Sequence, residues 1–240
     1  MPRHPLRLAP TFLAVVLLVV APGCGQPRDP GSVVDAVFDA YGGRDLLAGI
    51  EAVRLEGTIV TATQGGHGSF IRIVEGPDHL KVLLHYPRHV EIRIVEGDEG
   101  WSGGSPQTLA AASGPMLAAM QLQASRSWVP WILDEMRDSL EVERADSAVV
   151  VMSGPLRPGL VLRFYVDVHS HHVLRTESDM TTGGMQMEFA TDYGDFRTVS
   201  GLLVPFREES FASDTHTASL IVDTVLVNPP QQQRKLPLGG

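Results

Sequence analysis

Alternation of apolar and polar residues is the feature that most constrains how this chain can fold. Val53 and Leu55 alternate with Arg54 and Glu56, and the same period of two returns in short segments as far as Val227. Successive side chains of a strand point to opposite faces, so this period is typical of half-buried strands. The pattern predicts about ten or eleven strands, largely antiparallel, with one apolar face and one solvated face.

Helical spacing interrupts the strands at the start and in the middle of the chain. Ser32 is a favourable N-cap, apolar residues then recur at helical spacing, and Gly42-Gly43 ends the segment. A second short helix is expected at 44–50. Residues 109–123 and 128–136 predict two further helices, and the glycine-rich segment 97–104 is expected to be a loop. The fold class predicted is therefore α+β, mainly β.

The first 23 residues have the layout of a secretory signal peptide. Arg3 and Arg7 precede an apolar run at 12–20 that is shorter than the roughly 20 residues needed to cross a bilayer. Small residues then lead to Gly23-Cys24, which resembles a bacterial lipobox. We expect cleavage before Cys24 and lipidation of its thiol. An ordinary cleaved signal, with an incidental cysteine, is the alternative.

The rest of the chain divides into a tether, a domain and a tail. Residues 24–31 are polar and rich in Pro and Gly, as expected of a lipidated tether. Residues 32–228 predict one folded domain, and the Pro/Gln-rich residues 229–240 predict a flexible C-terminal tail. Gly25, where an aspartate would favour retention at the inner membrane in similar lipoproteins, favours the bacterial outer membrane, with the domain facing the periplasm.

Charge and cysteine content exclude several classes of function. The formal net charge is −9, which argues against binding to nucleic acid and against recruitment to anionic lipid by basic residues. Cys24 is the single cysteine, so a disulfide cannot form within one chain. We therefore expect the protein to be attached to the membrane through its lipid anchor.

Candidates for catalysis and metal binding are weak. Asp167, His169, His171 and His172 could supply metal ligands, but a solvated turn between two strands explains them more simply. Ser102 and Ser105 lie among glycines but have no obvious catalytic partner, and no acid–base couple is evident. We therefore predict a protein that is not an enzyme, with no catalytic residue, metal or cofactor. A hydrolase or metalloprotein that uses the histidine turn is the least favoured hypothesis.

Short sequence motifs at the ends of the predicted elements resemble those of a known family. They are Tyr41-Gly42-Gly43, Phe164-Tyr165-Val166-Asp167, Tyr193-Gly194-Asp195-Phe196, Gly201-Leu202-Leu203-Val204-Pro205 and Val225-Leu226-Val227-Asn228. With the order of the elements, they resemble the LolA/LolB-like outer-membrane lipoprotein-sorting superfamily over most of residues 32–228. The resemblance implies a curved, unclosed antiparallel half-barrel covered by helices, with a lipid or acyl chain held between them.

The alternation then suggests which side chains would line such a cavity. They are Leu80, Val82, Leu84, Ile92, Ile94, Leu162, Phe164, Met185, Met187 and Phe189, with Trp128 and Trp131 on the covering helices. The leading hypothesis is an envelope lipoprotein that binds lipid or lipoprotein acyl chains, as acceptor or carrier in outer-membrane sorting. The alternative is a non-catalytic structural or protein-interaction lipoprotein of an envelope complex, with the same fold, a protein partner and no ligand.

Overall fold

The computed structural model describes residues 29–62, 66–182 and 185–238. The predicted signal peptide, the proposed lipidation site Cys24 and most of the predicted tether lie outside these ranges. Within them, no helix combines the length and hydrophobicity that a bilayer span requires.

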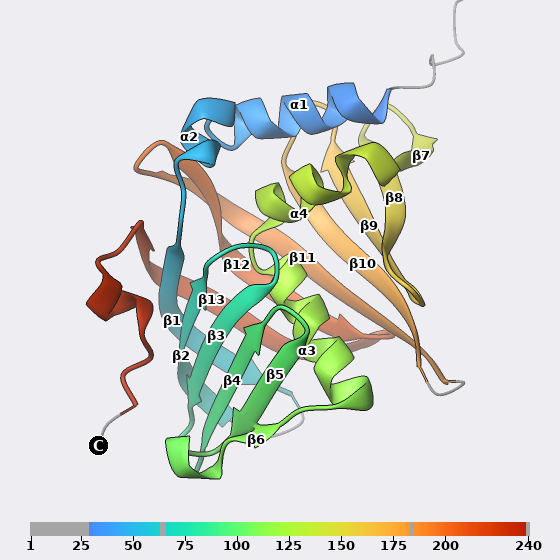
Figure 1. Ribbon diagram of the computed structural model, residues 1–240. Coiled ribbons are helices and arrows are strands. Elements are labelled where there is room, and N and C mark those ends of the chain that lie inside the picture. The colour runs from blue at the N-terminus through green and yellow to red at the C-terminus, as the bar shows by residue number, and fades with distance from the viewer. Residues whose placement is uncertain (1–28, 63–65, 183–184, 239–240) are drawn as a thin grey trace, which may run out of the picture.

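The strands of the described chain form one antiparallel sheet (Figure 1). Its first half contains β1 (Val53–Thr61), β2 (Gly66–Val74), β3 (His79–His85), β4 (Val90–Glu96), β5 (Glu99–Gly103) and β6 (Ala110–Ala111). Its second half contains β7 (Glu141–Ala145), β8 (Val149–Arg157), β9 (Leu160–Asp167), β10 (Val173–Thr182), β11 (Met185–Val199), β12 (Leu202–Ala212) and β13 (Thr215–Val227).

The two halves meet through the first and last strands. The strand order is β6-β5-β4-β3-β2-β1-β13-β12-β11-β10-β9-β8-β7, and Val53 of β1 pairs with Val227 of β13. The short strands β6 and β7 are the edges, so the sheet is curved but not closed. The predicted unclosed antiparallel half-barrel is confirmed.

The sheet has thirteen strands over the described residues, where about ten or eleven were expected. The two missed strands are β5, in the segment 97–104 expected to be a glycine-rich loop, and β6, at the start of the segment 109–123 expected to be helical. The helix there begins only at Gly114. A Cβ at Gly100 would lie 2.8 Å from Leu117 Cδ1, and one at Gly103 would lie 2.5 Å from the carbonyl oxygen of Thr108. Close packing therefore requires glycine inside this strand, where glycine usually signals a loop.

Four α-helices occur in the described part of the chain: α1 (Pro30–Ala40), α2 (Arg44–Ala48), α3 (Gly114–Arg126) and α4 (Val129–Met136). Helix α1 begins earlier than predicted. Asp29, and not Ser32, is the N-cap: its carboxylate accepts a hydrogen bond from the Ser32 amide at 2.9 Å, and Pro30 occupies the first turn. Residues 29–31 therefore belong to the helix and its cap, whereas they were assigned to the tether.

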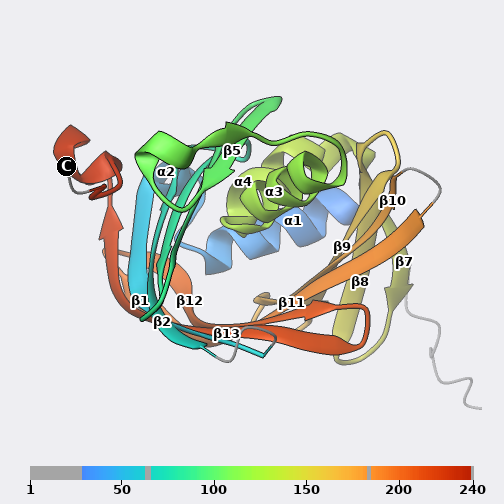
Figure 2. The ribbon, with the colours of Figure 1, turned by 90° about the horizontal axis from the view of Figure 1, so that it is seen from below.

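The helices cover the concave face of the sheet. In Figure 2 the sheet curves around α3, α4 and α1, with β1–β5 on one side and β8–β10 on the other. Helices α3 and α4 carry the chain from edge strand β6 to edge strand β7, and thus bridge the opening of the half-barrel. Asp35 of α1 anchors this layer, because its carboxylate accepts hydrogen bonds from Arg137 at 2.8 and 2.9 Å.

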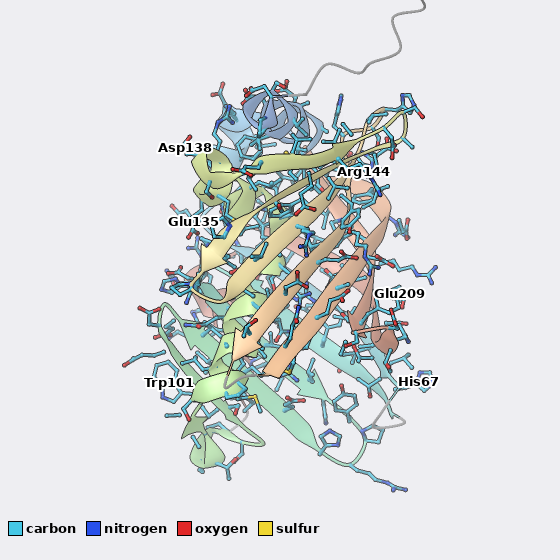
Figure 3. The ribbon with its side chains drawn as sticks, turned by 90° about the vertical axis from the view of Figure 1, so that its right-hand side faces the viewer. His67, Trp101, Glu135, Asp138, Arg144 and Glu209 are labelled. Carbon is cyan, nitrogen blue, oxygen red and sulfur yellow. The ribbon has the colours of Figure 1, made fainter. Side chains whose placement is uncertain are left out.

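The convex face carries ion pairs between neighbouring strands. On β9, the residues alternate between buried and partly exposed along the whole strand. Arg163 pairs with Asp179 at 2.6 Å, and Arg175 pairs with Asp192 at 2.7 Å. Figure 3 looks onto this side of the molecule, where polar side chains stand out from the strands. The predicted division into an apolar and a solvated face holds for this half of the sheet.

The C-terminal segment, expected to be a flexible tail, contains a 3-10 helix at Gln231–Arg234. It contacts β3 through Lys81, whose Nζ donates to the carbonyl oxygen of Arg234 at 3.4 Å, and it contacts β1 through Arg54. Arg54, which is buried, donates to the carbonyl oxygens of Gln233 at 2.8 Å and Lys235 at 3.3 Å. Arg234 donates to Glu51 at 2.9 Å. These bonds hold residues 229–238 beside β1, outside the half-barrel (Figure 1).

Candidate functional site

A cavity of about 320 Å³ lies between the concave face of the sheet and α3. It is partly open to solvent, and β1–β4, β11–β13 and α3 supply its walls. Its volume is at the lower end of the range for small-molecule sites, roughly 300–1,000 Å³. The apolar lining includes Ile59, Phe70, Val82, Leu84, Leu122, Phe189 and Leu220.

Three of the predicted lining residues border this cavity. Val82 and Leu84 face it from β3, and Phe189 faces it from β11. Leu80 lies further along the same face of β3 and is fully buried. The structure thus brings the middle of the predicted set together around the cavity, and their role in ligand binding stays a prediction.

The other predicted residues of the second half lie in the core beside the cavity. Leu162 and Phe164 on β9 are fully buried, and Met187 on β11 packs partly buried against the same core. The side chain of Met185 lies outside the described residues. Trp128 is buried and borders a second cavity of about 10 Å³. Trp131 packs edge-on against the Trp128 ring, with a distance of 6.1 Å between the ring centroids.

The predicted orientation of β4 was wrong. Ile92 and Ile94 were expected to face inward, but Val82 and Leu84 pair with Arg93 and Glu91 across the β3–β4 ladder. Directly paired residues share a face of the sheet, so the inner face of β4 carries the charged residues. Ile92 and Ile94 therefore point to the convex side, where Ile92 is nonetheless only 1% exposed.

The inward face of the sheet therefore brings charges into the cavity. Arg72 on β2 and Glu208 on β12 form a bidentate ion pair, with nitrogen–oxygen distances of 2.7 and 2.8 Å. Both side chains are buried and line the cavity. Burial disfavours the charged guanidinium, but the adjacent Glu208 carboxylate outweighs this effect and raises the pKa of Arg72.

A second cavity arginine is also held by a carboxylate. Arg93 donates from Nε to Glu91 at 2.7 Å and from Nη1 to Gln123 of α3 at 3.0 Å. The bond to Gln123 ties the covering helix to β4. Both carboxylates of the cavity lining are thus engaged by an arginine.

Arg126, the last residue of α3, also borders the cavity. Unlike Arg72 and Arg93, it is not paired with a carboxylate among the described residues. Its Nε and Nη1 atoms are buried and have no hydrogen-bond acceptor among the described residues. Burial lowers the pKa of Arg126. A cation in the last helical turn gains about 0.3–1 kcal/mol from the helix dipole. Unsatisfied buried donors cost about 1–3 kcal/mol each, and more when charged, so the helix end alone does not explain this arrangement.

Tyr193 of β11 fixes the end of α3 over the cavity. Its hydroxyl donates to the carbonyl oxygen of Arg126 at 3.1 Å, and it lies 3.1 Å from Thr176 Oγ1, which then acts as the donor to Tyr193. Burial, followed by the Glu208 carboxylate, raises the pKa of Tyr193 to about 12, so the hydroxyl stays protonated at neutral pH. The backbone of Arg126 is therefore positioned by bonds that leave its guanidinium free.

The histidine segment forms the turn between β9 and β10. Asp167 accepts hydrogen bonds from the amides of His169 at 3.0 Å and Ser170 at 2.7 Å, and His171 adopts a positive φ of 57°. No cluster of three or more potential metal ligands occurs among the described residues. The solvated-turn interpretation of this segment accounts for its geometry.

A Ser-His-Glu cluster, not anticipated from the sequence, lies on the convex face of β12 and β13. Ser219 Oγ lies 3.2 Å from His216 Nε2, and Glu209 Oε2 accepts from Ser219 and contacts the same His216 nitrogen at 2.8 Å. Figure 3 shows Glu209 at the surface of the sheet. In a nucleophilic triad the acid holds the other imidazole nitrogen, so this cluster lacks the relay geometry.

Comparison with known proteins shows the fold. No protein-family model and no curated protein matches the sequence. Among solved structures, a LolA superfamily protein from Nitrosomonas europaea superposes with a TM-score of 0.59 at 10% identity, covering 89% of this chain and 98% of that one. A putative outer membrane lipoprotein-sorting protein domain from Vibrio parahaemolyticus gives 0.55 at 12% identity, with coverages of 85% and 95%. A DUF1329 family protein from Desulfovibrio piger gives 0.54 at 8% identity, with coverages of 84% and 94%. The chain has a LolA-like fold.

Proposed function

We propose that this protein is a non-catalytic envelope lipoprotein that binds a lipid or lipoprotein acyl chain in the cavity beneath α3. The observation that carries the proposal is the cavity itself, with aliphatic and aromatic side chains on the sheet and on the covering helix. Each buried methylene of a chain contributes about 0.8 kcal/mol. Several methylenes against Phe70, Val82 and Leu84 therefore suffice for useful affinity without any chemical step.

The proposed place of action is the periplasmic side of the bacterial outer membrane. Two structural neighbours support it, since one is a LolA superfamily protein and another a putative outer membrane lipoprotein-sorting domain. Lipidation at Cys24 would hold the domain at the membrane. An anchored protein of this kind acts as an acceptor or holder of lipid, because it cannot cross the periplasm as a soluble carrier does.

Native mass spectrometry after gentle purification tests the binding proposal. Wild-type protein should carry a co-purified lipid, and Ala119→Phe or Ala218→Phe should lose it, because both alanines line the cavity and the larger ring fills it. The matched control is Met116→Phe on the same helix, since Met116 is 56% exposed and lies outside the lining. Reproducible absence of lipid from wild-type protein would instead favour the ligand-free, protein-interaction role.

The anchor is tested separately. Cys24→Ser should move an intact domain from the membrane fraction to the soluble periplasmic fraction, with unchanged thermal stability. Retention of the Cys24→Ser variant at the membrane would show that lipidation is not what holds it there.

A further inference from the structure

The charges of the cavity do not cancel. Among the described lining residues, three arginines (Arg72, Arg93 and Arg126) face two glutamates (Glu91 and Glu208). Glu208 gives both of its oxygens to Arg72, and Glu91 is held by Arg93. One positive charge, that of Arg126, is left over inside a protein whose formal net charge is −9.

We infer that the cavity takes an amphipathic ligand with one anionic group, a carboxylate or a phosphate, and that Arg126 pairs with this group. The inference rests on the proposed function, since it concerns the same cavity and names the class of ligand. It excludes a purely apolar guest and an uncharged lipid, and it narrows the ligands of the proposed function to those that carry a carboxylate or phosphate beside the acyl chain. The ligand's tail would lie against the apolar lining on β2 and β3.

Two observations on Arg126 carry the inference independently of the charge count. Its Nε and Nη1 atoms are buried and have no acceptor within the described chain, so the guanidinium fork remains available. A planar guanidinium binds carboxylate or phosphate oxygens with paired hydrogen bonds. The side chain also borders both the main cavity and the small neighbouring one, which places it at their junction.

The position of Arg126 is set before a ligand arrives. Tyr193 holds the carbonyl oxygen of Arg126, and Arg93 holds Gln123 one helical turn earlier. Neither bond uses the Arg126 side chain. A preorganised cation of this kind lowers the entropic cost of binding an anion, and it selects against neutral analogues, which would leave the buried donors unpaired.

The test compares ten-carbon probes by isothermal titration calorimetry on delipidated protein: decanoic acid, decyl phosphate and decanol. Wild-type protein should bind at least one anionic probe about tenfold or more tightly than decanol. Arg126→Met should abolish that preference while leaving decanol affinity unchanged, and Arg126→Lys should retain part of it. Arg144→Met, which removes an exposed charge on β7, is the control and should behave as wild type.

The outcomes separate the two proposals. A preference for decanoic acid identifies a carboxylate ligand, and one for decyl phosphate identifies a phosphate ligand. Equal affinities for all three probes in wild-type protein would overturn the anion inference, with Arg126 merely hydrated, and would leave lipid binding intact. Failure of every probe to bind would overturn both. Folding is monitored by thermal unfolding without ligand, where Arg126→Met should raise the Tm because it removes two buried donors that have no acceptor among the described residues.

Discussion

Arg72 and Glu208 lie 136 residues apart in the sequence, yet they form a bidentate ion pair at 2.7 and 2.8 Å inside the half-barrel. Arg72 belongs to the first group of strands and Glu208 to the second. Their pairing therefore crosses the β1–β13 junction from within, and it neutralises two of the charges in the cavity.

Removal of Glu208 should destabilise the protein strongly. Glu208→Gln leaves Arg72 buried without a counter-ion and close to Arg126, and breaking a buried pair in this way costs about 3–5 kcal/mol. Urea unfolding measures the loss. The exposed pair Arg197–Asp195 is the control, and Asp195→Asn should cost less than about 1 kcal/mol. A cost for Glu208→Gln as small as that of the control would contradict the arrangement.

Gly57 should tolerate no side chain. It lies at a bulge of β1, and a Cβ there would fall 2.0 Å from the carbonyl oxygen of Ile221 on β13. Gly57→Ala should therefore push β1 and β13 apart and lower the free energy of unfolding by about 1–3 kcal/mol. Gly194→Ala is the matched control, because its Cβ would meet no atom within 4 Å. Equal stabilities of the two variants would refute this account of the junction.

The Asp35–Arg137 pair should make part of the stability depend on pH. Hydrogen bonds from Arg137 and then Arg44 hold the pKa of Asp35 well below its usual range. The folded pKa lies below the unfolded value of about 3.9, so the stabilising effect is present above about pH 4 and is lost as the pH falls further. Wild type and Asp35→Asn, compared by urea unfolding across pH 2–7, should differ most at neutral pH and converge in acid. A constant difference between them would contradict the prediction.

The contacts of the C-terminal segment should protect it from proteolysis. Arg54 holds the carbonyl oxygens of Gln233 and Lys235, next to the tryptic sites at Arg234 and Lys235. Arg54→Leu should release this segment, and trypsin should then remove residues 236–240 much faster than from wild type. Mass spectrometry of the products measures the rate. Arg207→Leu, on the same convex face, is the control and should leave the cleavage rate unchanged.

Much of the fold could be predicted because the alternation of apolar and polar residues depends only on neighbouring positions in the sequence. Each strand carries its own period, and the order of elements was sufficient to indicate a LolA-like half-barrel. Glycine-rich β5 was missed because its glycines are required by neighbours distant in sequence, such as Leu117.

The face of β4 was predicted wrongly for a different physical reason. Ile92 and Ile94 are more apolar than Glu91 and Arg93, and apolarity alone places them inside. Cross-strand pairing with Val82 and Leu84 reverses this choice, and it is tolerable because the inward charges form ion pairs. The charged character of the site therefore depends on register and partners, which composition does not report.

The sequence around Arg126 contains one indication that this residue belongs to the site. Arg126 ends a helix rich in Ala, Leu and Met and stands just before the apolar cluster at Trp128 and Trp131. Only the structure shows that its Nε and Nη1 atoms are buried.

The pairing of β1 with β13 has a consequence for how the chain folds during synthesis. Residues 53–61 cannot complete their hydrogen bonds until residues 215–227 have been made. Until then β1 presents an unpaired edge, and no strand holds Glu208 of β12 beside Arg72. Contacts of such sequence separation slow folding and expose aggregation-prone edges. A chain truncated before β13 should therefore remain a poorly packed, aggregation-prone intermediate, although residues 1–214, about nine-tenths of the sequence, are present.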